Sequence, residues 1–166
     1  ATAREVIDQL ENKVEKKGLS IRMDKEYPDP IFVHADAERI YRVLVNLVSN
    51  AIKYTDKGKI QVGFEVMSDY VQISVHDSGV GIPPEDISRI FERFFRVDKS
   101  RSKESGGTGL GLAIVKHILE AHDAIVDVSS TVNKGSNFSF KLPIGQSTEE
   151  MEEEARLELE MMKEDT

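Results

Sequence analysis

Disulfide bonds and thiolate metal sites are excluded, because the 166-residue sequence contains no cysteine. The four histidines, His34, His76, His117 and His122, show neither the HExxH spacing nor another metal-ligand pattern, so a zinc site is not expected. The sequence also has no apolar run long enough to span a bilayer, and its first residues do not form a signal peptide. These absences predict a chain that makes no direct contact with a membrane.

No basic stretch of the kind that binds nucleic acid is present, so no nucleic-acid partner is expected. The formal net charge is −8, and residues 144–166 carry nine acidic side chains against Arg156 and Lys163. The residues before this tail are therefore almost neutral. The acidic tail is either a solvated, frayed helix or a helix with an apolar stripe that runs from Met151 to Met162.

Hydrophobic residues make up 39% of the sequence and charged residues 31%, which is typical of a soluble globular protein. The length is sufficient for one ordinary domain with its own core. The first residue is not methionine, which indicates a piece excised from a longer protein, although processing gives the same result. We expect a helix entering the domain at 1–18, the main domain at 19–143 and the acidic tail at 144–166.

Hydrophobic periodicity and turn signals predict helices and strands in mixed order. The expected helices are 2–17, 36–54 (capped by Asp36), 84–91 and 109–121. The expected strands are 19–26, 29–36, 60–66, 71–75, 124–131 and 136–142. Four of these strands form two antiparallel hairpins rather than regular βαβ units. This order predicts an α+β sandwich in which helices cover one face of a mixed sheet.

The helix predicted at 36–54 carries a polar stripe. Asn46, Asn50, Lys53 and Tyr54 lie on one helical face, beside an apolar arc that is expected to face the core. An unpaired buried amide costs about 1–3 kcal/mol, so the two asparagines need partners. Either neighbouring loops supply them, or the amide oxygens ligate a hard divalent cation while Lys53 contacts phosphate.

Glycines are concentrated in GGTGLGL, residues 106–112, where the last predicted helix begins. Glycine lets the backbone approach a ligand, and the free N–H groups of a helix N-terminus favour an anion such as phosphate. The segment does not match the dinucleotide fingerprint, which requires glycine where Leu112 stands, and no Walker loop occurs. A phosphate cradle and a hinge of a mobile loop both remain open.

Two smaller glycine clusters adjoin predicted strands. In DSGVG, residues 77–81, Asp77 either caps a turn or accepts a hydrogen bond from an exocyclic amine while the glycines leave room for a flat ring. KGSNF, residues 134–138, opens the last strand and is typical of a hairpin turn.

Taken in sequence order, these clusters resemble the catalytic, ATP-binding domain of sensor histidine kinases, which are members of the GHKL nucleotide-binding superfamily. The resemblance covers about residues 20–143 and is closest in style to the phosphate-responsive, membrane-anchored branch. It implies the two-layer α/β sandwich of the Bergerat (GHKL) ATP-binding fold. The motifs that carry it are NLVSNAIKY (46–54, N box), DSGVGI (77–82, first glycine box), FERFFRVD (91–98, F box), GGTGLGLAIVKHI (106–118, second glycine box) and KGSNFSF (134–140, third box).

The resemblance implies ATP and Mg²⁺ as cofactors. Asn50 would coordinate the Mg²⁺ that bridges the ATP phosphates, with Asn46 beside it. Lys53 would contact phosphate, and Tyr54 would lie near the base or the ribose. Asp77 would bind the adenine amino group, usually with water alongside.

The glycine boxes are implied to surround the nucleotide. Gly79 and Gly81 would shape the base pocket, with Ile82 assigned to cofactor binding beside them. Arg96 would reach the terminal phosphate, and residues 97–106 would form a lid over ATP. Together with Asn46 and Lys53, Arg96 completes the implied catalytic set. The phosphates would be cradled by the segment that contains Gly107, Thr108, Gly109, Leu110, Gly111 and Leu112.

The implied activity is transfer of the ATP γ-phosphoryl group to a histidine. None of the four histidines is followed by Glu, so the usual phosphoacceptor motif is absent from this sequence. The acceptor would therefore lie on the dimerisation helices of a parent kinase, and a response regulator would act downstream. We expect a cytoplasmic domain whose parent protein is anchored in the cell membrane. Phe91, Phe94 and Phe95 either pack in the core or dock on the acceptor helices.

Two turns depart from the family pattern: His122-Asp123-Ala124 replaces His-Gly-Gly, and Asn133 stands at a usual glycine. Asn tolerates a positive φ, so that turn should survive. Two other functions remain open, namely a GHKL-type ATP hydrolase and a nucleotide-binding regulatory module. The hydrolases use a Glu at the position of Asn46 as a general base, which an amide cannot replace. The serine-kinase anti-sigma branch shares the fold, but the F box and long lid favour histidine kinases.

Overall fold

The structure is a computed structural model that describes residues 2–23, 33, 35–93, 95, 111–144 and 148–164. Its helices are α1 (Thr2–Lys16), α2 (Ala37–Lys53), α3 (Pro84–Ile87), α5 (Gly111–Ala121) and α6 (Thr148–Glu164). Its strands are β1 (Ser20–Met23), β2 (Lys59–Val66), β3 (Tyr70–Asp77), β4 (Asp127–Thr131) and β5 (Gly135–Pro143).

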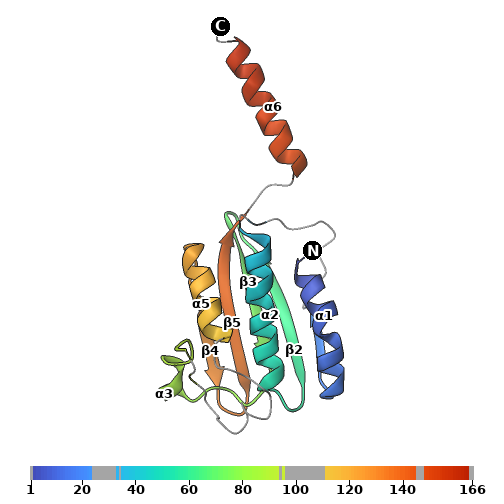
Figure 1. The fold of residues 1–166 in the computed structure, drawn as a ribbon, viewed down its shortest axis with the longest axis vertical. Helices are drawn as coiled ribbons and strands as arrows, with labels where there is room; N and C mark the ends of the chain where they lie inside the picture. Colours follow the sequence, from blue (N-terminus) through green and yellow to red (C-terminus); the bar gives the residue numbers. More distant parts are fainter. Residues whose placement is uncertain are drawn as a thin grey trace.

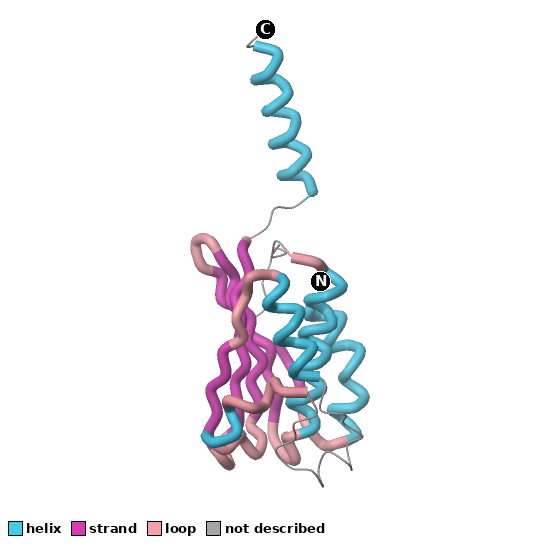
Figure 2. The backbone as a smooth tube through the Cα atoms, turned by 60° about the vertical axis from the view of Figure 1, so that its left-hand side comes forward, coloured by secondary structure: helices cyan, strands magenta, loops and turns pink. Residues whose placement is uncertain are grey.

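The five strands form one mixed sheet in the order β1-β2-β3-β5-β4. β1 runs parallel to β2, and the other neighbouring strands are antiparallel. Figure 1 shows α1, α2 and α5 lying over one face of the sheet, and Figure 2 shows these helices and the strands as two separate layers. The predicted α+β sandwich with a mixed sheet covered on one face by helices is therefore confirmed.

The hydrophobic core lies between these two layers. On α1, the apolar residues Val6, Leu10 and Val14 are buried. Truncating a buried leucine to alanine costs about 2–5 kcal/mol, so this packing fixes the helices firmly on the sheet. The apolar arc predicted for α2 is also buried throughout, and consists of Ile40, Val43, Leu44, Leu47, Val48 and Ala51.

The opposite face of the central strands is polar. His76 of β3 lies between Gln61 of β2 and Asn137 of β5, whereas the adjacent residues Val75 and Phe138 are buried against the helices. Such alternation is typical of an antiparallel sheet that is solvated on one face.

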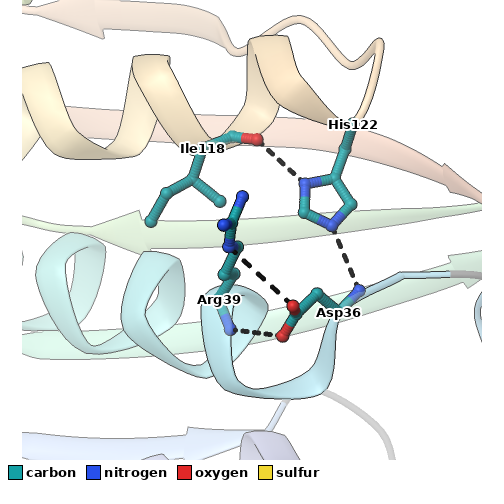
Figure 3. A network of polar contacts seen from close by, with 4 residues as sticks. All are labelled: Asp36, Arg39, Ile118 and His122. Carbon is teal, nitrogen blue, oxygen red and sulfur yellow. Dashed lines mark hydrogen bonds and ion pairs between the residues drawn. The ribbon is translucent and has the colours of Figure 1, made fainter.

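A network of hydrogen bonds ties the start of α2 to the end of α5 (Figure 3). As predicted, Asp36 caps α2, because its Oδ1 accepts a hydrogen bond from the Arg39 N–H at 3.2 Å. The Asp36 N–H donates to His122 Nε2 at 3.1 Å, and His122 Nδ1 donates to Ile118 O at 2.9 Å. Both ring nitrogens of His122 therefore have protein partners.

Some predicted elements are longer than those observed. α3 ends at Ile87 and continues as turns rather than as helix. β4 begins at residue 127 rather than 124, because the chain leaves α5 through a tight turn. In that turn Asp123 has a φ of 56°, and the Ala124 N–H donates to Leu119 O at 2.8 Å.

Three other predicted elements lie only partly within the described residues. Of the strand predicted at 19–26, β1 covers Ser20–Met23, and residues 24–26 lie outside the described residues. α5 is described from Gly111 onward, two residues after its predicted start. Of the strand predicted at 29–36, Val33 forms an isolated antiparallel bridge with Ile144, and most of the remainder lies outside the described residues.

The acidic tail forms α6, which Figure 1 shows extending away from the sandwich. All side chains from residue 152 to residue 164 are exposed, including Leu159 at 60% and Met162 at 69%. The solvated-helix interpretation of the tail therefore agrees with the structure. Within the described parts of the chain, no helix is both long and apolar enough to cross a bilayer.

Candidate functional site

Three segments meet where α2 and β3 end. The Val80 N–H donates to Tyr54 O at 3.0 Å, and the Asn133 N–H donates to Val80 O at 2.8 Å. The Ile82 N–H donates to Ser130 Oγ at 2.8 Å. The loop that follows β3 is therefore held between the last turn of α2 and the β4–β5 hairpin. We call this region the junction.

Asp77, the last residue of β3, is the buried acid of the junction. Only 3% of its surface is exposed, and its Oδ1 accepts a hydrogen bond from the Gly79 N–H at 2.9 Å. Burial raises the pKa of Asp77 above its ordinary value of 3.8, while backbone hydrogen bonds from Gly79 and Ser136 and the charge of His76 oppose this rise. A buried carboxylate of this kind is a candidate ligand contact.

Thr55 places a second polar side chain beside this carboxylate. It is completely buried, and its hydroxyl has no hydrogen-bond partner of good geometry within the described part of the chain. The hydroxyl nevertheless lies close enough to Asp77 to lower the pKa of that acid. A Cβ added at Gly79 would lie 2.7 Å from Thr55 Oγ1 and 2.8 Å from Asp77 Oδ1, so both oxygens border the same small space.

Gly81 and Gly135 bring the β4–β5 hairpin against the end of β3. A side chain on Gly81 would collide with Thr131 O, and one on Gly135 would collide with Asp77 O. Their φ angles are 75° and 128°, which glycine adopts most readily. Asn133, with a φ of 65°, also takes the left-handed conformation that the sequence predicted it to tolerate. The hairpin turn predicted in KGSNF is confirmed, and it forms one wall of the junction.

Asn46 faces the N-terminus of α5. A Cβ added at Gly111, the first described residue of α5, would lie 3.8 Å from Asn46 Oδ1. Asn46 Nδ2 is buried and has no hydrogen-bond partner among the described residues. An unsatisfied buried donor costs about 1–3 kcal/mol, and the adjacent helix N-terminus offers N–H groups to an anion. The stripe on α2 therefore includes an amide that neighbouring described loops do not satisfy.

The remaining residues of the stripe border the same part of α2. Asn50, Lys53 and Tyr54 are half-buried, whereas Ala51 and Ile52 between them are buried in the core. The Lys53 ammonium lies 5.3 Å from the centre of the Tyr54 ring. The polar stripe is thus at the margin of the buried face, as the sequence predicted.

Other predicted site residues are only partly covered by the structure. Ile82 is buried in the core, and Leu112 is partly buried and packs against the core. The structure brings Asp77, Gly79 and Gly81 together at the junction, and places Asn46 beside Gly111. The predicted residues that lie outside the described residues are Arg96, Gly107, Thr108, Gly109 and Leu110, together with the predicted lid at 97–106.

The aromatic group of the F box belongs at least partly to the core. The Phe91 ring meets the Phe138 ring edge to face, with 6.4 Å between their centroids. Phe95 is also partly buried against the core, and the Arg89 guanidinium lies 4.7 Å from the centre of its ring. Phe94 lies outside the described residues, so docking by Phe94 stays a prediction.

Sequence reasoning missed Thr55 and the serines that fix the hairpin. Ser130 Oγ donates to Gly135 O at 3.0 Å and lies 2.8 Å from the hydroxyl of Ser136, its partner across the β4–β5 ladder. The two-residue alternation of DVSST and GSNFSF could have indicated that these serines share a face. Their contact with the loop after β3 depends on the sheet order, which no local pattern gives.

Comparison with known proteins agrees with this geometry. Residues 35–146 match the family model for histidine kinase-, DNA gyrase B- and HSP90-like ATPases. The sensor histidine kinase WalK of Bacillus subtilis is 38% identical over 154 residues, which are 90% of this chain and 25% of WalK. The phosphate regulon sensor protein PhoR of Pseudomonas aeruginosa is 47% identical over 105 residues, which are 63% of this chain and 24% of PhoR. The chain spans about a quarter of the length of these relatives.

Solved structures show the same similarity. The catalytic domain of histidine kinase ThkA has a TM-score of 0.70 and 37% identity, and the match covers 86% of this chain and 92% of that one. Full-length ShkA in complex with AMPPNP has a TM-score of 0.75 and 30% identity, over 88% of this chain and 30% of that one. This chain belongs to the histidine kinase-, DNA gyrase B- and HSP90-like ATPase family, as an ATP-binding catalytic domain of the sensor histidine kinase type.

Proposed function

We propose that the chain binds ATP with Mg²⁺ and transfers the γ-phosphoryl group to a histidine on a separate dimerisation and phosphoacceptor domain. The observation that carries the proposal is the Asp77 carboxylate, which is 3% exposed and lies beside the Thr55 hydroxyl, a group with no hydrogen-bond partner of good geometry among the described residues. An ionised carboxylate accepts a hydrogen bond from the exocyclic amine of adenine. Guanine has a carbonyl at that position, so the same group disfavours GTP.

The phosphates would lie toward α5. Asn46 has an unsatisfied amide beside Gly111, where the helix offers N–H groups and the positive end of its dipole. Lys53 adds a positive charge on the same stripe of α2. These features would orient the polyphosphate so that the acceptor nitrogen attacks in line.

The residues present fit a Mg²⁺ ion that is shared with the phosphates. Within the described residues, no group of three or more His, Asp or Glu side chains is placed to form a metal cage. Mg²⁺ bound to nucleotide phosphates needs only one or two protein oxygens. Asn50, half-buried and one turn from Asn46, would offer its amide oxygen. When bound, the ion neutralises charge on the transferred group.

Phosphotransfer is favoured over hydrolysis by the identity of Asn46. A hydrolase needs a base that activates water, and an amide cannot accept that proton. The chain would therefore hold ATP until the acceptor histidine reaches it. Its partners would be the dimerisation helices of the parent kinase and, indirectly, a response regulator. We infer that the domain acts in the cytoplasm and that the parent protein is anchored in the cell membrane.

The test is a calorimetric titration of the chain with ATP, in Mg²⁺ and then in EDTA. The chain and two variants, Asn50→Ala and Asn137→Ala, are compared. Asn137 lies on the polar face of the sheet and serves as the matched control. We expect binding that weakens in EDTA and in Asn50→Ala but is unchanged in Asn137→Ala. Labelled ATP then tests transfer to a phosphoacceptor domain supplied separately.

Each contrary result has a distinct meaning. A chain that binds neither ATP nor ADP would overturn the proposal. ATP that binds but is hydrolysed rapidly without an acceptor would favour the hydrolase. ATP that binds but is neither hydrolysed nor transferred to any acceptor would favour the regulatory module.

A further inference from the structure

The last turn of α2 is held by a side chain from the residue that directly follows α1. Lys17, which follows α1, donates through Nζ to Ile52 O at 2.6 Å and to Lys53 O at 3.1 Å. The same ammonium lies 4.0 Å from the Asp56 carboxylate. One cation therefore contacts two carbonyl groups at the end of α2 and an acid in the turn that follows.

This position is where a helix most needs a cation. The last four carbonyls of a helix have no partner within it, and the C-terminal end of the dipole is negative. A lysine from another element satisfies both conditions, and hydrogen bonds from a charged donor are stronger than neutral ones. The side chain of Asp56 is 62% exposed and that of Lys17 is 33% exposed, so solvent weakens their ion pair more than the two carbonyl contacts.

The turn that Lys17 holds is also one side of the junction. Tyr54 directly follows Lys53, and Tyr54 O accepts the hydrogen bond from Val80 in the loop after Asp77. A shift of this turn would therefore move both the stripe on α2 and the loop that bears Gly79. α1 itself is anchored by its buried apolar residues, so Lys17 projects from a fixed element.

We propose that Lys17 is a positioning residue that couples α1 to the nucleotide site. It fixes the position of the last turn of α2 relative to the loop after β3, and ATP binding at the junction depends on that position. This inference rests on the proposed function, because it concerns ATP bound at the same site. A displacement of α1 would then be transmitted to the site through this cation as well as through the packing of α1 on α2.

The test compares both ends of α2. Lys17→Met keeps an unbranched apolar stem but removes the ammonium, and Lys17→Arg restores a charged donor. His122→Ala is the matched control, because it removes the hydrogen bond to the Asp36 N–H at the opposite end of α2. The readouts are the melting temperature, the Kd for ATP with Mg²⁺, and KM and kcat in phosphotransfer.

For Lys17→Met we expect Kd and KM for ATP to rise about tenfold, the usual effect of losing a charged hydrogen bond, with kcat changed less than about twofold. Lys17→Arg should recover most of this affinity. His122→Ala should lower the melting temperature but change Kd less than about twofold, because its contact is remote from the junction.

Three results would overturn the inference. Lys17→Met could bind ATP as tightly as the unchanged chain, or His122→Ala could weaken ATP in the same proportion to its loss of melting temperature. Alternatively, Lys17→Met could lower kcat alone. If Lys17→Met did not fold, Lys17→Gln would replace it with the same expectation, since its shorter, neutral side chain also lacks the ammonium. Failure of the unchanged chain to bind ATP would instead refute the proposed function.

Discussion

The two ends of helix α2 differ in how their polar groups are satisfied. At the start of the helix, Asp36 caps the first turn and both nitrogens of His122 have protein partners. Toward the other end, Asn46 Nδ2 and Thr55 Oγ1 are buried, and neither has a hydrogen-bond partner of good geometry among the described residues. Both regions belong to one sandwich and one core.

This difference distinguishes the end of α2 that stabilises the fold from the end whose polar groups are available to a ligand. Buried polar groups in folded proteins almost always have partners, and a group without one costs about 1–3 kcal/mol. The first end of α2 spends its polar groups on holding α5. The second end has the Thr55 hydroxyl beside the buried acid Asp77 and the unsatisfied Asn46 amide beside Gly111, which is the condition expected where a ligand completes the bonding. The following predictions test that contrast, from the largest effect to the smallest.

The largest effect should come from Gly135→Ala. The added methyl group would collide with Asp77 O, and alanine is strained at the φ of 128° that this position has. We therefore expect a loss of about 3 kcal/mol in the free energy of unfolding. Gly18→Ala is the control, because Gly18 has a φ of 77° but no neighbouring atom within 4 Å. It should cost only about 1 kcal/mol. Denaturant unfolding measures both, and equal losses would show that the junction is not tightly packed.

Asp77→Asn should weaken ATP binding about 30- to 100-fold, because the ligand loses a charged acceptor. The amide oxygen can still accept from Gly79, and the desolvation cost of the buried charge disappears. We therefore expect an unchanged or higher melting temperature. Asp127→Asn on β4 is the exposed control. Parallel losses of melting temperature and affinity in Asp77→Asn would mean that Asp77 only caps a turn.

Asn46→Leu and Asp36→Ala should change the free energy of unfolding in opposite directions. Leucine has nearly the shape of asparagine and removes an unsatisfied buried amide, so the nucleotide-free chain should gain about 1 kcal/mol while ATP affinity falls. Asp36→Ala removes a helix cap and should lose about 1 kcal/mol without a change in affinity. Denaturant unfolding measures the stability of each variant, and calorimetric titration measures its affinity for ATP. A destabilised Asn46→Leu variant would show that Asn46 has a structural partner after all.

Lower pH should affect ATP binding and stability in opposite directions through Asp77. Burial raises the folded pKa above 3.8, so the contribution of this group to stability is greatest below the unfolded pKa and is lost as pH rises through the folded pKa. ATP affinity should instead fall as pH drops through the folded pKa, because the protonated acid accepts poorly. Titrations between about pH 7 and pH 4 test this. Both dependences should disappear in Asp77→Asn, and their persistence there would assign them to another group.

The smallest effect should follow removal of residues 146–166. The described side chains of α6 are exposed from residue 152 onward, so no core contact is lost with them. We expect the Kd for ATP to change less than about twofold and the melting temperature to change little. A large loss of either would show that α6 packs on the sandwich in solution.

Local patterns were sufficient for the elements that carry a strong periodicity. The buried arc of α2, its cap Asp36 and the β2–β3 hairpin all follow from spacing that one segment contains. The sheet order was not available in this way, because β1 pairs in parallel with β2 across the whole of α2. Pairing between distant segments depends on tertiary packing rather than on local preference.

The candidate site was also predictable only where a local pattern marks its residues. Asp77 and the stripe on α2 are distinguished by residue types that are unusual for their positions, so a sequence can reveal them. Thr55, Ser130 and Lys17 are ordinary residues whose importance comes from contacts with segments 22 to 48 positions away along the chain. Those contacts exist only after the sandwich has formed.

The glycines of the junction also limit how its sequence can change. Gly79 borders Asp77 Oδ1 and Tyr54 O, and Gly135 lies against Asp77 O, so substitutions at these positions share a neighbour. Effects on residues that share a contact do not add. Under the proposed function, in which Asp77 contacts the base, a variant for a different base therefore cannot be reached by altering Asp77 alone and then adjusting its surroundings one residue at a time. The loop and the hairpin would have to change together, which makes this junction a poor starting point for stepwise redesign.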